Sequence, residues 1–421
     1  MNSVREISKT ILLLFLVFIA KFNFAQSYVN SSINSQRAIT TSVPFLMISP
    51  DARTGALGDC GVALPDDLNA NHWNAAKLPF NEKQGAVSVS YTPWLRTLVP
   101  DVSLSYLSAY GKINDRSAVS GSLTYFSLGE IQFTDQTGGS LGNFTPNEFA
   151  GDVAYAQKLS DNFSVGVAFR FIYSNLAGGF NQSTNPISPG KSYAGDITCY
   201  YKNDKEIQHY KVNYGWGAAI TNIGSKITYT TSQYANFIPI NLRIGGYGQV
   251  EIDKYNTIAL MVDLNKLLVP TNPIYALDSN GRQVTGSNGK PLIQSGLDPN
   301  VPVIQGMMQS VYDAPGGFSE KMQEITISTG MEYWYDKQFA IRAGYFYENP
   351  TKGNRQFLTM GMGVKYNVFG LDASYLVSFG QHNPLENTLR FTLTFDFDAF
   401  KTQNKTEEKN NNIFEAPPAT N

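Results

Sequence analysis

The sequence predicts an all-β fold, a transmembrane antiparallel β-barrel of about 14 strands that is preceded by an N-terminal plug segment. Three observations predict this fold. Apolar residues alternate with small or polar ones in segment after segment between residues 85 and 398. The connections between these segments are alternately tight and long. The composition is poor in charged residues, yet too polar for a bundle of membrane-spanning helices.

Two segments show the alternation most clearly. From Phe163 to Tyr173, aromatic residues and valines occupy every second position, and the positions between them hold small residues and Arg170. Near the end of the chain, leucine and phenylalanine alternate with Arg390 and with threonines. Because successive side chains of a strand point to opposite faces, one face is expected to meet lipid and the other the lumen.

The connections distinguish this barrel from a soluble β-sandwich, the alternative that alternation leaves open. Tight links are expected at Asn114–Arg116, Ser160–Asn162, Asp253–Lys254, Asp336–Lys337 and Asn367–Gly370, with a somewhat longer one at Lys202–Gln208. Long links are expected at Thr92–Asp101, Leu128–Asn147, Asn175–Ser192, Gly224–Ile238, Asn265–Gln323, Asn349–Asn354 and Gly380–Glu386. Outer-membrane barrels sort short turns and long loops to opposite ends, whereas a sandwich has no reason to do so.

The composition agrees with a barrel. Charged residues make up 16% of the chain and aromatic residues 13%, against roughly 25% charged residues in an ordinary soluble domain. The mean hydropathy of -0.21 excludes a helical bundle. A net charge of -2, with no basic block that could follow a phosphate backbone, argues against nucleic acid as a partner.

Four segments follow in order along the chain. Residues 1–25 are expected to be a signal peptide, because the apolar run Ile11–Ala20 follows Arg5 and Lys9. Residues 26–84 are expected to plug the barrel, which occupies residues 85–398, and residues 399–421 have the composition of a disordered periplasmic tail. An even number of strands leads us to expect both termini in the periplasm and the long loops outside.

No catalytic site, cofactor site or metal site is expected. The three histidines, His72, His209 and His382, have no ligand-like spacing. The glycine-rich segment 53–61 lacks the Lys-Ser or Lys-Thr pair of a phosphate loop. Cys60 and Cys199 could form one disulfide, but two unrelated small apolar side chains are the simpler interpretation.

Charged residues on the lumen face are expected to pair with one another across the interior, and not to catalyse a reaction. They are the basic Arg170, Arg243, Arg342 and Arg390 and the acidic Asp263, Glu332, Glu348 and Asp372.

The plug holds the most distinctive motif. Residues 49–59 read Ser-Pro-Asp-Ala-Arg-Thr-Gly-Ala-Leu-Gly-Asp, and the motif positions are Asp51, Arg53, Gly55, Gly58, Asp59, Gly61, Trp73 and Asn74. This motif resembles the amino-terminal segment of the PorV (LptO) family of the type IX secretion system and, more distantly, the hatch of FadL-type transporters. Ala75 stands where the PorV pattern has proline, and Cys60 stands where alanine is usual.

The PorV resemblance implies a non-enzymatic outer-membrane protein. Such a protein would bind secreted cargo by its carboxy-terminal signal domain beside a SprA-type translocon barrel. It would then carry the cargo to an attachment complex with a PorU-type sortase. The long loops offer apolar candidates for partner contact: Trp94, Leu95, Leu98, Leu268, Met307, Met308 and Phe318. Trp94 and the segment Leu267–Val269 could equally be girdle residues at the surrounding outer-membrane lipid.

Two other functions stay open from the sequence. The FadL resemblance implies a channel for uptake of hydrophobic small molecules, and glycine-rich strands such as the one with Gly245, Gly246 and Gly248 would permit the kink that a lateral exit needs. The third possibility is an inert barrel that anchors other envelope proteins.

Overall fold

The computed structural model describes residues 37–94, 101–134, 137–176, 188–230, 235–287, 289–378 and 388–397. The expected signal peptide and tail lie outside the described residues, as do Leu95, Leu98 and His382.

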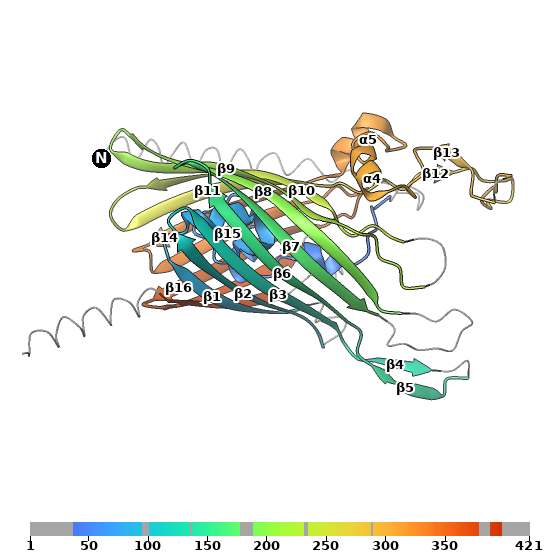
Figure 1. The fold of residues 1–421 in the computed structure, drawn as a ribbon, viewed down its shortest axis with the longest axis horizontal. Helices are drawn as coiled ribbons and strands as arrows, with labels where there is room; N and C mark the ends of the chain where they lie inside the picture. The colour runs from blue at the N-terminus through green and yellow to red at the C-terminus, as the bar shows by residue number, and fades with distance from the viewer. Residues whose placement is uncertain are drawn as a thin grey trace, which may run out of the picture. The chain divides into compact units, whose positions relative to one another are not determined.

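Within the described part of the chain, fourteen strands close into one antiparallel barrel, which confirms the predicted fold class (Figure 1). Each strand pairs with its neighbour along the barrel, and the wall closes where the first strand pairs with the last. The barrel strands are β1 (Gly85–Pro93), β2 (Val102–Asn114), β3 (Ser117–Leu128), β6 (Asn147–Lys158), β7 (Phe163–Asn175), β8 (Gly190–Ile207), β9 (Tyr210–Gly224), β10 (Asn241–Glu251), β11 (Asn256–Leu267), β14 (Ile325–Tyr335), β15 (Phe339–Tyr347), β16 (Gln356–Tyr366), β17 (Phe369–Ser378) and β18 (Leu389–Asp396).

The strands divide their side chains between two faces as predicted. On β7, Val167 and Phe169 are 55% and 54% exposed on the outer face, whereas Ser164 and Arg170 are buried on the inner face. On β18, Leu393 is exposed and Arg390 is buried. The outer wall is therefore apolar, as contact with lipid requires, and the polar side chains are gathered inside.

The alternation of short and long connections is also confirmed, with one correction. The predicted link at Lys202–Gln208 is mostly strand, because β8 continues to Ile207 and the turn consists of Gln208 and His209. Both turn residues have positive φ, 49° and 76°. Such a two-residue turn matches the twist of the flanking strands, so the hairpin extends further than the sequence indicated.

The long connections carry further elements at one end of the barrel, which we call the long-loop end (Figure 1). Short hairpins are formed by β4 (Ile131–Thr134) with β5 (Ser140–Phe144) and by β12 (Ile274–Tyr275) with β13 (Ile293–Ser295). Two helices, α4 (Val303–Gln309) and α5 (Gly317–Gln323), precede β14. None of the described helices combines the length and the apolarity needed to cross a bilayer.

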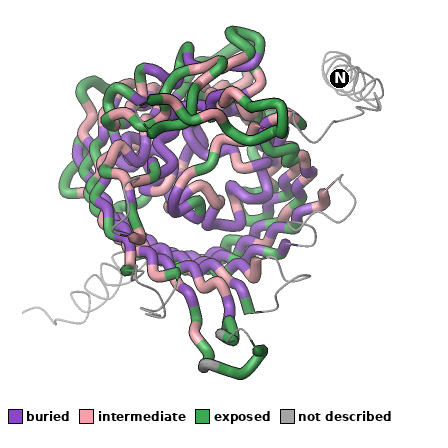
Figure 2. The backbone as a smooth tube through the Cα atoms, turned by 90° about the vertical axis from the view of Figure 1, so that its right-hand side faces the viewer, coloured by how far each residue is buried: buried purple, intermediate pink, exposed green. Residues whose placement is uncertain are grey.

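The plug, which we define as residues 43–81, lies inside the barrel, where Figure 2 shows a largely buried trace enclosed by the wall. It contains four short helical turns, η2 (Pro44–Met47), α2 (Ala52–Gly55), α3 (Ala70–Trp73) and η3 (Ala75–Phe80). Its hydrogen bonds reach several strands of the wall. Ala52 N–H donates to Thr392 on β18, and the Asn71 side chain donates to Ser122 on β3.

An apolar cluster fills the long-loop end of the lumen around η2. Phe45 and Leu46 of the plug, 1% and 5% exposed, pack in this cluster with Phe237 and Ile238 from the β9–β10 loop. Phe126 at the end of β3 stacks on Phe45 with ring centroids 6.2 Å apart. We call this group the apolar cluster.

The first and last described residues, Arg37 and Phe397, lie at opposite ends of the barrel. Both chain termini lie outside the described residues, so the expectation that both are periplasmic stays a prediction. The strand-count argument holds for the wall itself, because β1 begins and β18 ends at the short-turn end. The plug, however, runs through the lumen before β1. Arg37 therefore contacts the long loops, with its backbone N–H donating to the Thr351 carbonyl at 3.1 Å.

Candidate functional site

The side chain of Asp263 on β11 binds the backbone of the plug. Its carboxylate accepts hydrogen bonds from the N–H groups of Gly61 and Val62, at 2.7 and 2.9 Å. A side chain at Gly61 would collide with the ring of Trp73, so glycine is required by close approach. Gly58 is required for a second reason, since its φ is +67° and a Cβ there would lie 2.7 Å from the backbone of Tyr345.

The other motif residues fix the plug in itself and against the wall. Asp51 caps α2 by accepting from the Thr54 N–H at 2.9 Å and also accepts from the Trp73 indole at 3.3 Å. The Asn74 side chain donates to the carbonyls of Val62 and Cys199, both at 2.9 Å, which joins the plug to β8. The motif is therefore a docking sequence for the lumen.

Arg53 is the strongest ionic link between plug and wall. Its guanidinium donates to both carboxylate oxygens of Glu332 on β14, at 2.9 and 2.8 Å, and to the backbone carbonyls of Pro65 and Asp66. Arg342 on β15 donates to the same carboxylate at 2.6 Å. This bidentate geometry is the arrangement in which a buried ion pair is most favourable.

Pairing between the predicted lumen charges is confirmed for Arg342 with Glu332 and Asp372. Arg170 instead pairs with two carboxylates that were not predicted from the sequence. Arg342 also contacts Asp372 at 2.7 Å. Arg170 lies between Asp152 on β6 and Asp196 on β8, and the second contact is 3.2 Å long. Asp152 on β6 and Asp196 on β8 occupy lumen-facing positions in strands whose polarity alternates along the sequence. This alternation is the signal that could have identified them. The remaining predicted charges have other partners. Arg390 makes an ion pair with Asp59 of the plug, and Glu348 makes one with Arg355. The Arg243 guanidinium lies over the ring of Trp73.

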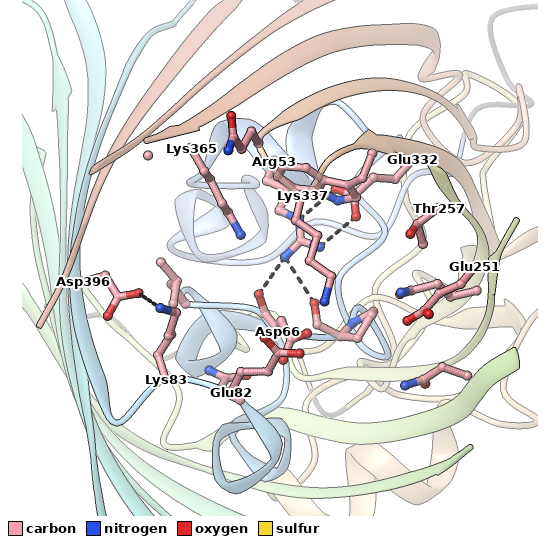
Figure 3. A pocket seen from close by; sticks show the side chains of 18 of the residues that line it. Arg53, Asp66, Glu82, Lys83, Glu251, Thr257, Glu332, Lys337, Lys365 and Asp396 are labelled. Carbon is pink, nitrogen blue, oxygen red and sulfur yellow. Dashed lines mark hydrogen bonds and ion pairs between the residues drawn. The ribbon is translucent and has the colours of Figure 1, made fainter. Parts of the chain in front are cut away.

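A polar cavity of about 830 Å³ opens at the short-turn end of the lumen (Figure 3). Arg53 and Glu332 form its inner wall, while Lys337 and Lys365 reach into it from the barrel. Its other charged lining residues include Asp66, Glu82, Lys83, Glu251 and Asp396. Both acidic and basic side chains line this opening, so it suits water or a charged ligand.

A patch of exposed apolar side chains covers α4, α5 and the segment between them. On α4, Ile304 and Met308 are 62% and 68% exposed, and on α5, Phe318 and Met322 are 80% and 51% exposed. Each pair has i,i+4 spacing and so shares one helix face. Val311 and Tyr312, 60% and 67% exposed, lie between the two helices in the sequence. We call these six residues the loop patch.

The predicted partner-binding residues differ in location and in burial. Met308 and Phe318 belong to the loop patch. Met307 is half-buried against the apolar cluster, and Trp94 is half-buried against it too. Leu268 is 8% exposed within that cluster. Partner contact by Leu268 stays a prediction without support, because little of this side chain is left exposed.

Four members of the loop patch were not predicted from the sequence: Ile304, Val311, Tyr312 and Met322. Apolar residues at i and i+4 within the large loop were the signal that could have found them.

Two chemical expectations can be compared with the described residues. No group of three or more His, Cys, Asp or Glu side chains in the described part of the chain is placed to hold a metal ion. Cys60 and Cys199 are not joined in a disulfide, as the simpler interpretation predicted.

Gly246 and Gly248 face outward on β10, whose pairing with β9 and β11 continues without a break, so these glycines do not kink the wall.

A comparison with protein-family models decides the assignment. The model described as "Type IX secretion system protein PorV" matches residues 31–274, which is more than half of the chain. The chain belongs to the PorV family. Membership confirms the resemblance of the plug motif and makes this barrel an outer-membrane component of the type IX secretion system. A search of curated proteins found no match.

Solved structures with a similar fold have low sequence identity. The toluene transporter TodX of Pseudomonas putida is 9% identical with a TM-score of 0.43, and the alignment covers 81% of this chain and 95% of TodX. The toluene transporter TbuX of Ralstonia pickettii is 10% identical with a TM-score of 0.43, covering 83% and 98%. A FadL homologue of Pseudomonas aeruginosa is 11% identical with a TM-score of 0.40, covering 86% and 100%.

Proposed function

We propose that this PorV-family barrel is a non-enzymatic receptor for secreted proteins at the cell surface. It binds cargo by the carboxy-terminal signal domain at a SprA-type translocon barrel. It then delivers the cargo to an attachment complex that contains a PorU-type sortase. The long-loop end faces outward in this proposal, and the short turns face the periplasm, as in other outer-membrane barrels.

The loop patch is the observation that carries the proposal. Phe318 on α5, Met308 on α4 and Tyr312 between them are more than 65% exposed at the long-loop end. Exposed apolar side chains that gather in one segment, outside the core and the lipid-facing wall, are typical of protein-binding surfaces. Methionine side chains adapt to different partners, which suits a receptor for many cargo proteins.

The filled lumen favours a surface function over a hydrophobic channel. Phe45, Leu46 and Phe237 pack together at the long-loop end, where an apolar ligand would enter from outside. The cavity at the other end is lined by charged groups. A passive anchor would need neither feature, and it would not expose a loop patch on ordered helices.

A binding assay with matched variants tests the proposal. The double variant Met308→Ser/Phe318→Ser removes apolar area from the loop patch, and Ile207→Ser/Tyr366→Ser makes the same type of change at the short-turn end, where these residues are 52% and 71% exposed. With a purified secreted protein that bears a carboxy-terminal signal domain, we expect only the first pair to weaken binding, by about 10-fold or more for two anchor residues. Equal binding by all three proteins would contradict the proposal.

The channel alternative has its own assay. Vesicles that contain the purified barrel are given labelled long-chain fatty acid, and uptake is compared with that of protein-free vesicles. We expect no difference, and saturable uptake by the barrel would support the channel instead.

A further inference from the structure

The chain segment that leads into the plug crosses the long-loop end and contacts three separate loops. The Arg37 N–H donates to the Thr351 carbonyl in the β15–β16 loop at 3.1 Å. The Asn272 side chain, from the β11–β14 loop, donates to the Ala38 carbonyl at 3.4 Å. The Ser42 N–H donates to the Phe237 carbonyl in the β9–β10 loop at 2.9 Å. We call residues 37–42 the strap; it connects directly to η2 of the plug.

The strap also makes an ion pair with α5, the helix that carries Phe318 and Met322. The Arg37 guanidinium donates to Glu320 at 2.8 Å, and Lys352 donates to the other oxygen of the same carboxylate at 2.5 Å. The Gly316 N–H adds a third hydrogen bond at 2.7 Å. Glu320 is therefore held from the strap, from the β15–β16 loop and from the start of its own helix.

A second carboxylate extends this cluster beneath α5. Glu324 accepts from Lys266 at the end of β11 at 2.7 Å, from Lys321 at 3.0 Å and from Lys352 at 3.3 Å. Lys321 also contacts Asp313. The cluster thus brings four cationic side chains, counting Arg37, against three carboxylates, and Glu320, Lys321 and Glu324 are each less than 8% exposed.

The two patch helices depend on such contacts for their orientation. Each is seven residues long, and isolated helices this short are unstable in water. Four of the six patch side chains point away from the protein with more than 60% of their area exposed, so they contribute little packing. The position of α5 is therefore set from below by the charge cluster and by the strap that meets it. The position of α4 is set by Val303 and Met307, which pack on the apolar cluster.

We propose that the strap positions the loop patch for partner binding, with Arg37 acting through Glu320 as a positioning residue. The inference deepens the proposed function and rests on it, because the loop patch is taken as the binding surface. The strap is continuous with the plug, so plug and patch form one connected unit. A change in the plug would then alter the receptor surface at the long-loop end.

The test uses full-length protein in lipid nanodiscs and three substitutions. Arg37→Glu places a second carboxylate against Glu320, Arg37→Lys keeps the positive charge, and Arg116→Glu makes the same reversal at an exposed pair with Asp161, 4.0 Å apart, at the short-turn end. The first readout is the dissociation constant for a purified secreted protein with a carboxy-terminal signal domain. The second is the rate at which a protease cleaves within residues 303–324.

Arg37→Glu is expected to raise the dissociation constant about fivefold, which corresponds to the upper end of the free energy that one partly exposed ion pair contributes. It is also expected to speed cleavage of the patch helices. Arg37→Lys is expected to restore both values, and Arg116→Glu is expected to leave both unchanged. The barrel should remain heat-modifiable on a gel in every variant. If Arg37→Glu fails to insert, Arg37→Ala is judged by the same two readouts.

Two results would overturn the inference in distinguishable ways. Unchanged binding by Arg37→Glu, together with weak binding by Met308→Ser/Phe318→Ser, would show that the strap does not position the patch, and the proposed function would survive. Unchanged binding by both variants would remove the proposed function and this inference together.

Discussion

The link between plug and barrel wall depends most strongly on Glu332, and Glu332→Gln is the change that tests it. The carboxylate is 2% exposed and neutralises Arg53 of the plug and Arg342 of the wall. Removing one member of a buried ionic group costs about 3–5 kcal/mol, because the remaining charge stays buried without its partner. Asp372 still neutralises Arg342, so we expect a cost near the lower value, about 3 kcal/mol.

Hydrogen exchange measures this cost locally. If the plug opens and recloses faster than exchange, a loss of about 3 kcal/mol speeds exchange of the plug amides roughly 100-fold. The peptide to follow is residues 51–63, which includes the Gly61 and Val62 N–H groups bound by Asp263. Wall peptides from β6 and β7 should keep their protection.

Asp161→Asn serves as the control, because the Asp161 side chain is 97% exposed and its ion pair with Arg116 is 4.0 Å long. It should leave exchange of the plug unchanged. An increase below about threefold in Glu332→Gln, with the barrel intact, would refute the view that this ionic group holds the plug.

Two further predictions concern the plug and the patch helices. Gly58→Ala should loosen the plug by more than about 2 kcal/mol, because alanine disfavours a φ of +67° and its Cβ would meet the backbone of Tyr345; Gly111→Ala, with nothing within 4 Å of its Cβ, should have no such effect in the same exchange assay. Burial raises the pKa of Glu320, but hydrogen bonds from Lys352 and the Gly316 N–H outweigh burial and hold the pKa below its usual 4.5. A lowered pKa in the folded state stabilises the fold above the unfolded value, and this stabilisation is lost as the pH falls through the folded value. An acid-stable protease should therefore cleave residues 303–324 at a constant rate from about pH 7 to pH 5 and faster only below about pH 4; faster cleavage already at pH 6 would contradict this assignment.

The wall of the barrel could be predicted from the sequence because its determinants are local. In β7, the polarity of each side chain from Phe163 to Tyr173 predicts whether it faces lipid or the lumen, and turn-forming residues predict where the strand ends. The prediction fails at Lys202–Ile207, where charged residues suggest a loop. These residues form a strand beyond the membrane-facing band, where neither face of the hairpin needs to be apolar.

The candidate site was harder to predict because burial in the loops is decided by distant partners. Leu268 and Met308 are both apolar residues of the same long loop, yet one packs on Phe237 and its neighbours and the other is 68% exposed. The direction of the plug through the lumen also depends on contacts such as Arg37 with Glu320, which are 283 residues apart in sequence. Local patterns do not carry such information.

Photo-crosslinking in living cells tests the central claim most directly. A photoreactive amino acid is placed at Phe318 in the loop patch, or at Tyr366 at the short-turn end as the matched exposed position. The account predicts that Phe318 becomes joined to secreted proteins with carboxy-terminal signal domains or to the translocon barrel, and that Tyr366 does not. Crosslinks to cargo from Tyr366 alone, or only to lipid from Phe318, would contradict it.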